Sequence, residues 1–214
     1  MQQRTSHILY NYWNDVRGVR LAPRRFEIEP SRISKILAET FILERTDSHN
    51  YSFRLAGTRI CEQFGMEFRG RNFVELAGEA DRSALEQDLA TITDQGAVGI
   101  FELEARDRQE RPVRFETIVL PLIHGRQGVS RYVGSFSAVD TPPWLGFEPL
   151  QPHGLTSRRL MWPDGRPHAV VERVNRQAPF LPELANARIV RFNRQHFRVL
   201  DGGRKPSRPG ELSD

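Results

Sequence analysis

The chain has 214 residues, a formal net charge of +4 and a hydrophobic fraction of 38%, which suits one large domain or one domain with an appendage. Its single cysteine, Cys61, excludes an internal disulfide and any multi-cysteine metal site. No apolar run approaches the ~18–20 residues that cross a bilayer, and the first residues lack the apolar stretch of a signal peptide, so we expect a cytoplasmic protein.

The charges are unevenly distributed along the chain. Residues 1–150 contain 19 basic and 21 acidic residues, whereas residues 151–214 contain 12 basic and 6 acidic residues. An excess of cations in one segment is typical of a region that meets an anionic partner. The basic character of the protein therefore belongs to its C-terminal part.

An amphipathic helix is predicted near the N-terminus. Its apolar residues recur at helical spacing, and they are Ile8, Leu9, Tyr12, Trp13 and Val16. Gly18 is suited to end this helix. An extended stretch bounded by Pro23 and Pro30 follows, and Ser31 can cap a further short helix.

Strands and short helices are predicted to alternate after residue 40. Residues 40–45 and 51–55 suit two strands, and the polar side chains of residues 47–50 favour a turn that joins them as a hairpin. Three helical segments are predicted next, at residues 57–65, 70–77 and 79–95.

Three further strands are predicted at residues 98–106, 112–123 and 131–139. The last two carry apolar residues on both faces, so the sheet must be covered on both sides. We expect the helices after the second strand to cover one face. The N-terminal helix is expected to cover the other, either within its own subunit or across a homodimer.

Composition divides the chain into five parts. They are an N-terminal helix and extended cap (1–30), a main domain (31–140), a Pro-rich linker (141–157), a β-rich basic extension (158–201) and a disordered tail (202–214).

Several short motifs stand out between residues 7 and 139. They are Tyr12-Trp13, the stretch from Pro23 to Pro30, Phe53-Arg-Leu-Ala-Gly-Thr58, Gly70-x-x-Phe73 with Glu75-Leu76, Glu116 and Leu120-Pro-Leu122. Together they resemble PAS domain proteins, specifically a compact variant common in alphaproteobacteria. The resemblance implies an α+β fold with a five-stranded antiparallel sheet of strand order 2-1-5-4-3, helices on one face and an N-terminal helix.

By the same resemblance, a ligand would lie between the inner face of the sheet and the helices after the second strand. The candidate lining residues are Phe41 or Ile42, Phe53, Arg54, Leu85, Leu89, Phe101, Leu103, Phe115, Glu116, Thr117 and Phe136. The alternative is that these side chains simply fill the space as a core, because protein interiors are close-packed.

Arg54 is the most informative charge, because it lies mid-strand between two apolar residues. A buried arginine needs an anionic partner, and Glu116 is the candidate. The pair would fix the hairpin or the N-terminal segment, or Arg54 would bind an anionic ligand.

No cofactor or metal is expected. The segment 79–95, where the resemblance would place a haem ligand, has no histidine, and Cys61 lacks the motif of a flavin photosensor. The sequence also has no His-x-x-x-His pair for zinc and no Gly-x-Ser-x-Gly or phosphate-binding glycine loop. We therefore expect no enzyme.

The sequence thus predicts a stand-alone PAS sensory module that acts by binding a small ligand, a signalling protein or a second copy of itself, without membrane attachment. An alternative uses the basic C-terminal region to bind nucleic acid or a cyclic nucleotide. Arg194 and Arg198 have an Arg-x-x-x-Arg spacing similar to that of PilZ domains, which bind cyclic di-GMP, and Arg191 lies close to them in sequence.

Overall fold

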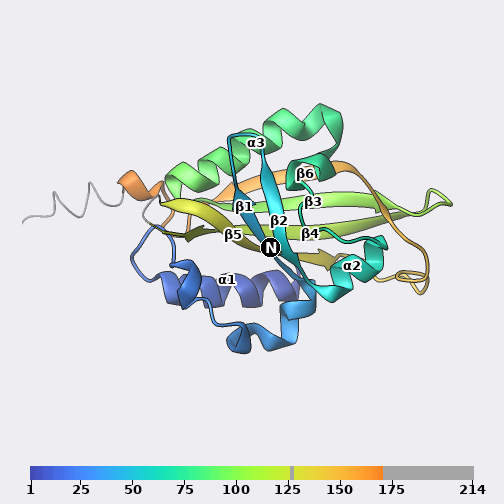
Figure 1. Cartoon of the computed structure of the whole chain (residues 1–214), viewed down its shortest axis with the longest axis horizontal. Coiled ribbons are helices and arrows are strands. Elements are labelled where there is room, and N and C mark those ends of the chain that lie inside the picture. Colours follow the sequence, from blue (N-terminus) through green and yellow to red (C-terminus); the bar gives the residue numbers. More distant parts are fainter. Residues whose placement is uncertain (126–127, 171–214) are drawn as a thin grey trace, which may run out of the picture. The chain divides into compact units, whose positions relative to one another are not determined.

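The computed structural model describes residues 1–125 and 128–170, all of which belong to the first of two units of the chain, residues 1–177. Its centre is a six-stranded antiparallel sheet in the order β2-β1-β5-β4-β3-β6 (Figure 1). The strands are β1 (Thr40–Arg45), β2 (Tyr51–Ala56), β3 (Val98–Arg106), β4 (Pro112–Ile123), β5 (Val129–Ala138) and β6 (Gln151–Met161). The predicted hairpin and the order 2-1-5-4-3 are confirmed.

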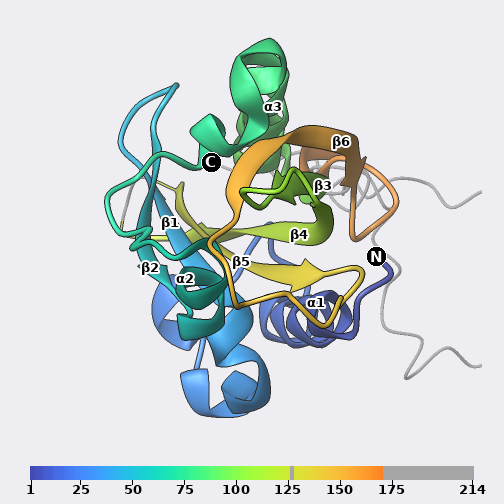
Figure 2. The same cartoon turned by 90° about the vertical axis from the view of Figure 1, so that its right-hand side faces the viewer.

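Helices lie on both faces of this sheet. The α-helices are α1 (Arg4–Arg17), α2 (Thr58–Phe64) and α3 (Gly78–Gln95), and the 3-10 segments are η1 (Arg25–Glu27), η2 (Pro30–Glu39) and η3 (Phe73–Ala77). Figure 2 shows α3 and α1 on opposite sides of the strands. The face toward α3 is called the inner face below, and the face toward α1 the outer face.

The inner face carries the larger hydrophobic core. It joins Phe41 of β1, Phe53 of β2 and Phe115 of β4 to Phe64 of α2 and Leu89 of α3, all of them buried. Side chains alternate along a strand, so the neighbours of these residues in the sequence point to the outer face. The predicted double covering of the sheet follows from this alternation.

The outer face is covered by α1 of the same chain. Leu9 and Trp13 are fully buried there, against strand residues that include Ile118 and Leu120. The sequence predicts that both residues cover the sheet either of their own subunit or of a second copy, and the structure has the first arrangement. They are unavailable for a contact with a second copy, because the apolar outer face of their own sheet already buries them. The other three residues of that set, Ile8, Tyr12 and Val16, are half-buried and pack against the same cluster.

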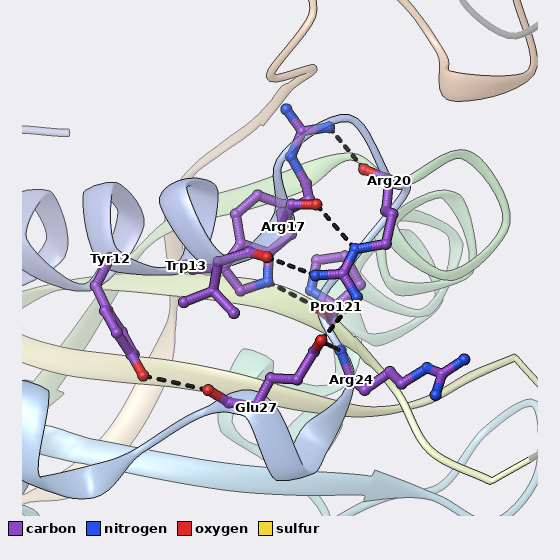
Figure 3. A network of polar contacts seen from close by, with 8 residues as sticks. Tyr12, Trp13, Arg17, Arg20, Arg24, Glu27 and Pro121 are labelled. Atoms are coloured by element: carbon purple, nitrogen blue, oxygen red, sulfur yellow. Dashed lines mark hydrogen bonds and ion pairs between the residues drawn. The ribbon is translucent and has the colours of Figure 1, made fainter.

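A polar network holds the C-terminal end of α1 against the loop that follows it (Figure 3). The indole N–H of Trp13 donates a hydrogen bond of 2.8 Å to the carbonyl oxygen of Pro121. The guanidinium of Arg20 forms an ion pair of 2.8 Å with Glu27, which also accepts a hydrogen bond from the backbone N–H of Arg24. That backbone hydrogen bond, aided by Arg20, holds the pKa of Glu27 below its usual range. The network fixes the position of η1.

The sixth strand differs from the predicted five-stranded sheet. β6 pairs with β3 from Val98 opposite Met161 to Arg106 opposite Gln151, so it occupies residues that sequence analysis divided between a linker and an extension. The pairing satisfies the backbone groups of β3, which would otherwise be an edge strand. Pro152 is tolerated because β6 is itself an edge strand. The rest of the expected extension, 171–201, and the expected tail, 202–214, lie outside the described residues.

Candidate binding surfaces

Aromatic rings fill the space between the inner face and the helices. The ring of Phe41 lies with its centroid 5.4 Å from that of Phe53, 5.8 Å from Phe73 and 5.3 Å from Phe136. Phe64 of α2 extends this cluster, because its centroid is 5.3 Å from that of Phe68 and 5.4 Å from that of Phe115. Centroid separations of about 4.5–7 Å are those of rings in direct contact. The rings therefore form one continuous packed layer.

The hollow that remains within this layer is very small. The hollow beside Phe64, Leu103 and Phe136 has a volume of about 10 Å³, which is about the room that a single water molecule needs. The expected pocket residues of the inner face do lie together and are buried; they are Phe41, Phe53, Leu85, Leu89, Phe101, Leu103, Phe115, Thr117 and Phe136. The site that the resemblance implied is thus occupied by the protein's own side chains.

The predicted pair between Arg54 and Glu116 does not form. Arg54 has 54% of its side chain exposed, and its Nε lies 3.2 Å from a carboxylate oxygen of Glu44. The prediction was wrong because β2 is an edge strand, and Arg54 follows the buried Phe53, so its side chain points away from the inner core.

Glu116 instead holds the start of the chain on the outer face. Its carboxylate is buried and accepts hydrogen bonds from the backbone N–H groups of Gln2 and Gln3 just before α1, the latter at 3.0 Å. Burial raises the pKa of Glu116, but the Ser6 hydroxyl together with these backbone N–H groups outweighs it, and the pKa is lowered. Glu116 therefore positions α1 and does not line the inner core.

A polar cleft of about 610 Å³ lies among the start of α1, α2, the end of β5 and the loop 141–146. Its central carboxylate, Glu39, is paired with Arg59 and accepts a hydrogen bond from the hydroxyl of Thr5. Ser137 donates a further, long hydrogen bond of 3.5 Å to the same carboxylate. The Glu39 carboxylate is thus satisfied within the protein, and the other polar side chains that line the cleft include Arg4, Glu62, Gln63 and Thr141.

An apolar groove of about 560 Å³, called the outer groove below, lies between η2 and the outer face of β1 and β2. It is lined by Arg25, Ile28, Pro30, Ile33, Ser34, Leu37, Ala38, Thr40, Ile42, Leu55, Ala56, Gly57, Thr58 and Val133. Leu55 is 52% exposed and Leu37 is 36% exposed. Two large apolar side chains are therefore exposed side by side at an open groove.

Sequence analysis missed the outer groove. Leu55 was read as part of a strand and Leu37 as part of a helix that follows Ser31, and neither pattern shows which apolar residues stay uncovered. Simple alternation along the strand would place Leu55 on the same face as Phe53, two residues before it. The register shift between Ile42 and Leu43 instead places Leu55 opposite Ile42 on the outer face.

Residues 1–125 and 128–170 were also searched for metal sites and membrane-spanning helices. No group of three His, Cys, Asp or Glu side chains is placed there to hold a metal ion, and no helix in these ranges has the length and apolar character needed to cross a bilayer. Cys61 is a half-buried residue of α2. The alternative anion-binding residues Arg191, Arg194 and Arg198 lie outside the described part of the chain.

The comparisons with known proteins agree with the fold. The sequence profile of the PAS domain family matches residues 1–137. No curated protein sequence matches the chain.

Solved structures that resemble the chain include a light-oxygen-voltage (LOV) protein of Rhodobacter sphaeroides, which is 12% identical at a TM-score of 0.40, over 54% of this chain and 71% of that one. A PAS domain of an HTR-like protein from Haloarcula marismortui is 18% identical at a TM-score of 0.38, over 54% of this chain and 95% of that one. An RNA-binding light-oxygen-voltage receptor is 17% identical at a TM-score of 0.40, over 51% of this chain and 32% of that one.

Proposed function

Because the chain belongs to the family of PAS domains, we propose that it is a signalling module that acts through contact with a partner protein and catalyses no reaction. The observation that carries this proposal is the packed layer of aromatic rings between the inner face and the helices. PAS domains are sensory modules that work through a ligand or through protein contacts. The filled inner face favours protein contacts here.

The energetic argument rests on what a core ligand would have to displace. Entry of a molecule larger than water would require at least one buried ring, such as that of Phe64 or Phe136, to leave its place. Removing a buried phenylalanine from a core costs about 3–5 kcal/mol, and a domain is stable by only about 5–15 kcal/mol. A ligand would have to offset that cost before it bound with any net affinity.

The outer groove supports a role in partner binding. It is open and largely apolar, and removing its exposed leucines from water is favourable in free energy. Fully burying an exposed leucine contributes about 1.5–3 kcal/mol; Leu55 is 52% exposed and Leu37 36% exposed, so each can still gain roughly a third to a half of that. The groove can thus contribute to the apolar centre of an interface.

Cross-linking in the cells that produce the protein tests this proposal. The full chain would be compared with Leu55→Asp, which places a charge in the outer groove, and with the matched control Phe147→Asp, since Phe147 is 83% exposed and outside the groove. We expect a cross-linked protein partner with the wild type and the control, and its loss with Leu55→Asp. An identical cross-linking pattern for all three proteins, or no partner for any of them, would contradict the proposal.

A further inference from the structure

We propose that the outer groove binds an amphipathic helix of a partner protein whose polar flanks are acidic. This inference rests on the proposed function, because it names the chemistry of the partner that the groove would receive. Three features support this inference. The helical layer on the outer face is incomplete, three cations near the groove have no ion-pair partner among the described residues, and the neighbouring edge of β2 is closed to an added strand.

The helical layer on the outer face ends before the sheet does. α1 packs against β4 and β5, whereas the outer-face residues Ile42 of β1 and Leu55 of β2 line the open groove. η2 forms the wall between these two regions through Ile33 and Leu37. A helix laid beside η2 would continue the layer and cover these apolar side chains, as amphipathic helices do in hydrophobic grooves.

The charge beside the groove selects the partner's flanks. Arg25 lines the groove, whereas Arg32 and Lys35 are exposed on η2, the wall of the groove, without belonging to its lining; within the described residues no ion pair is found for any of the three. The nearby Glu27 is already paired with Arg20. Glu29 is therefore the nearby carboxylate that can offset the charge of these three cations. The surroundings of the groove are therefore net positive, and complementary charge favours an acidic partner and speeds its association.

The neighbouring edge of the sheet is closed to an added strand. The backbone of Phe53 in β2 donates to the carbonyl oxygen of Arg71 at 2.9 Å and accepts from the N–H of Gly70 at 2.8 Å. The N–H of Tyr51 is taken by the side chain of Asn72 at 3.0 Å. Since these groups are occupied, a partner cannot pair along this part of β2 and must bind through side chains, which favours a helix over a strand.

A designed peptide provides the direct test. An 18-residue peptide with leucines at helical spacing and glutamates on both flanks would be titrated against the full chain by fluorescence anisotropy. Two further peptides serve as comparisons. One has lysine in place of glutamate, and the other has the composition of the acidic peptide in a scrambled order. We expect micromolar binding of the acidic peptide, and binding about tenfold weaker for the lysine peptide and weaker still for the scrambled one.

Variants of the chain localise the binding. Leu55→Asp should weaken the binding of the acidic peptide by about tenfold or more, and Phe147→Asp should leave its binding unchanged. The double variant Arg32→Glu and Lys35→Glu, which alters exposed residues only, should reverse the preference between the acidic and the lysine peptide. Circular dichroism of each variant establishes that the fold is retained.

Several results would overturn the inference. Equal binding of the acidic and lysine peptides would show that the partner need not be acidic. If Phe147→Asp weakened binding as much as Leu55→Asp, the outer groove would not be the binding site. Binding to phosphatidylglycerol vesicles that depends on Leu55, without binding of the acidic peptide, would assign the groove to a membrane surface. A dimer in sedimentation that Leu55→Asp dissociates would assign it to a second copy of the chain.

The two proposals fail differently. If the acidic peptide does not bind but the cross-linked partner still depends on Leu55, the chemistry assigned to the partner is wrong and the proposed function stands. If both measurements are negative, both proposals fall.

Discussion

At the scale of single residues, Glu116 shows how one buried carboxylate can position a helix. It lies on the outer face of β4 and accepts hydrogen bonds from backbone N–H groups that precede α1, which α1 itself cannot satisfy. A buried charge is stable only when it is paired or hydrogen-bonded in this way. The N-terminal segment and the sheet therefore depend on each other.

Replacement of this carboxylate should make α1 less stably attached. Glu116→Gln keeps the shape of the side chain but removes its charge, and we expect a loss of about 1–3 kcal/mol in the free energy of unfolding at pH 7. Urea unfolding measures this loss, and hydrogen exchange should show faster exchange at residues 2–9. Unchanged stability and exchange would show that Glu116 does not hold α1.

The same carboxylate predicts a pH dependence. Because the pKa of Glu116 is lower in the folded than in the unfolded protein, its stabilisation is present above the unfolded pKa, about 4.3, and is lost as the pH falls through the folded pKa. The stability of the wild type should therefore fall more steeply below pH 4–5 than that of Glu116→Gln. Parallel curves for the two proteins would contradict this account.

At the scale of elements, α1 is held at both ends. Glu116 holds its start, and Arg17 at its end forms a two-pronged ion pair with Asp164, with N–O distances of 2.9 and 3.0 Å. Only 4% of the Arg17 side chain is exposed. The hydrogen bonds from Arg17 keep the pKa of Asp164 below its usual range. This pair joins α1 to the turn that follows β6.

Loss of the ion pair between Arg17 and Asp164 should destabilise the protein. Asp164→Asn should lower the free energy of unfolding by about 1–3 kcal/mol, since it leaves the buried guanidinium without its charge partner. The matched control is Asp140→Asn, because Asp140 pairs with Arg114 at the exposed surface, where such pairs contribute about 0–1 kcal/mol. Thermal unfolding of both variants compares them, and equal effects would mean that Arg17 and Asp164 are not a special contact.

At the scale of the whole molecule, the sequence predicted the arrangement of the first five strands and the need to cover both faces of the sheet. The order of the strands follows from the resemblance to PAS domains, whereas the need for two coverings follows from local alternation, as in β4, where Phe115 and Ile118 belong to opposite faces. The addition of β6 to the sheet was not predicted, and strand structure was expected only from residue 158, because an edge strand with mostly exposed side chains has no apolar alternation to reveal it. The sequence also could not show that inner-face residues pack ring against ring, since an apolar residue that lines a cavity and one that fills it look alike.

The outer groove escaped prediction for a related reason. Leu55 and Leu37 come from a strand and a 3-10 segment that meet only in the folded chain, and their exposure depends on how far α1 extends over the sheet. The motifs that resemble PAS domains concern the core and its turns. They identify the family and carry no information on the outer groove.

The central claim is that the space between the sheet and α3 is filled by the protein's own rings, so that the protein acts through its surface. Native mass spectrometry of the full chain purified from its cells, compared with the same sample after denaturation, tests it most directly. We predict that the native protein carries no small molecule beyond the mass of its polypeptide. A stoichiometric small mass that is lost on denaturation would contradict the account and make the inner face a ligand site.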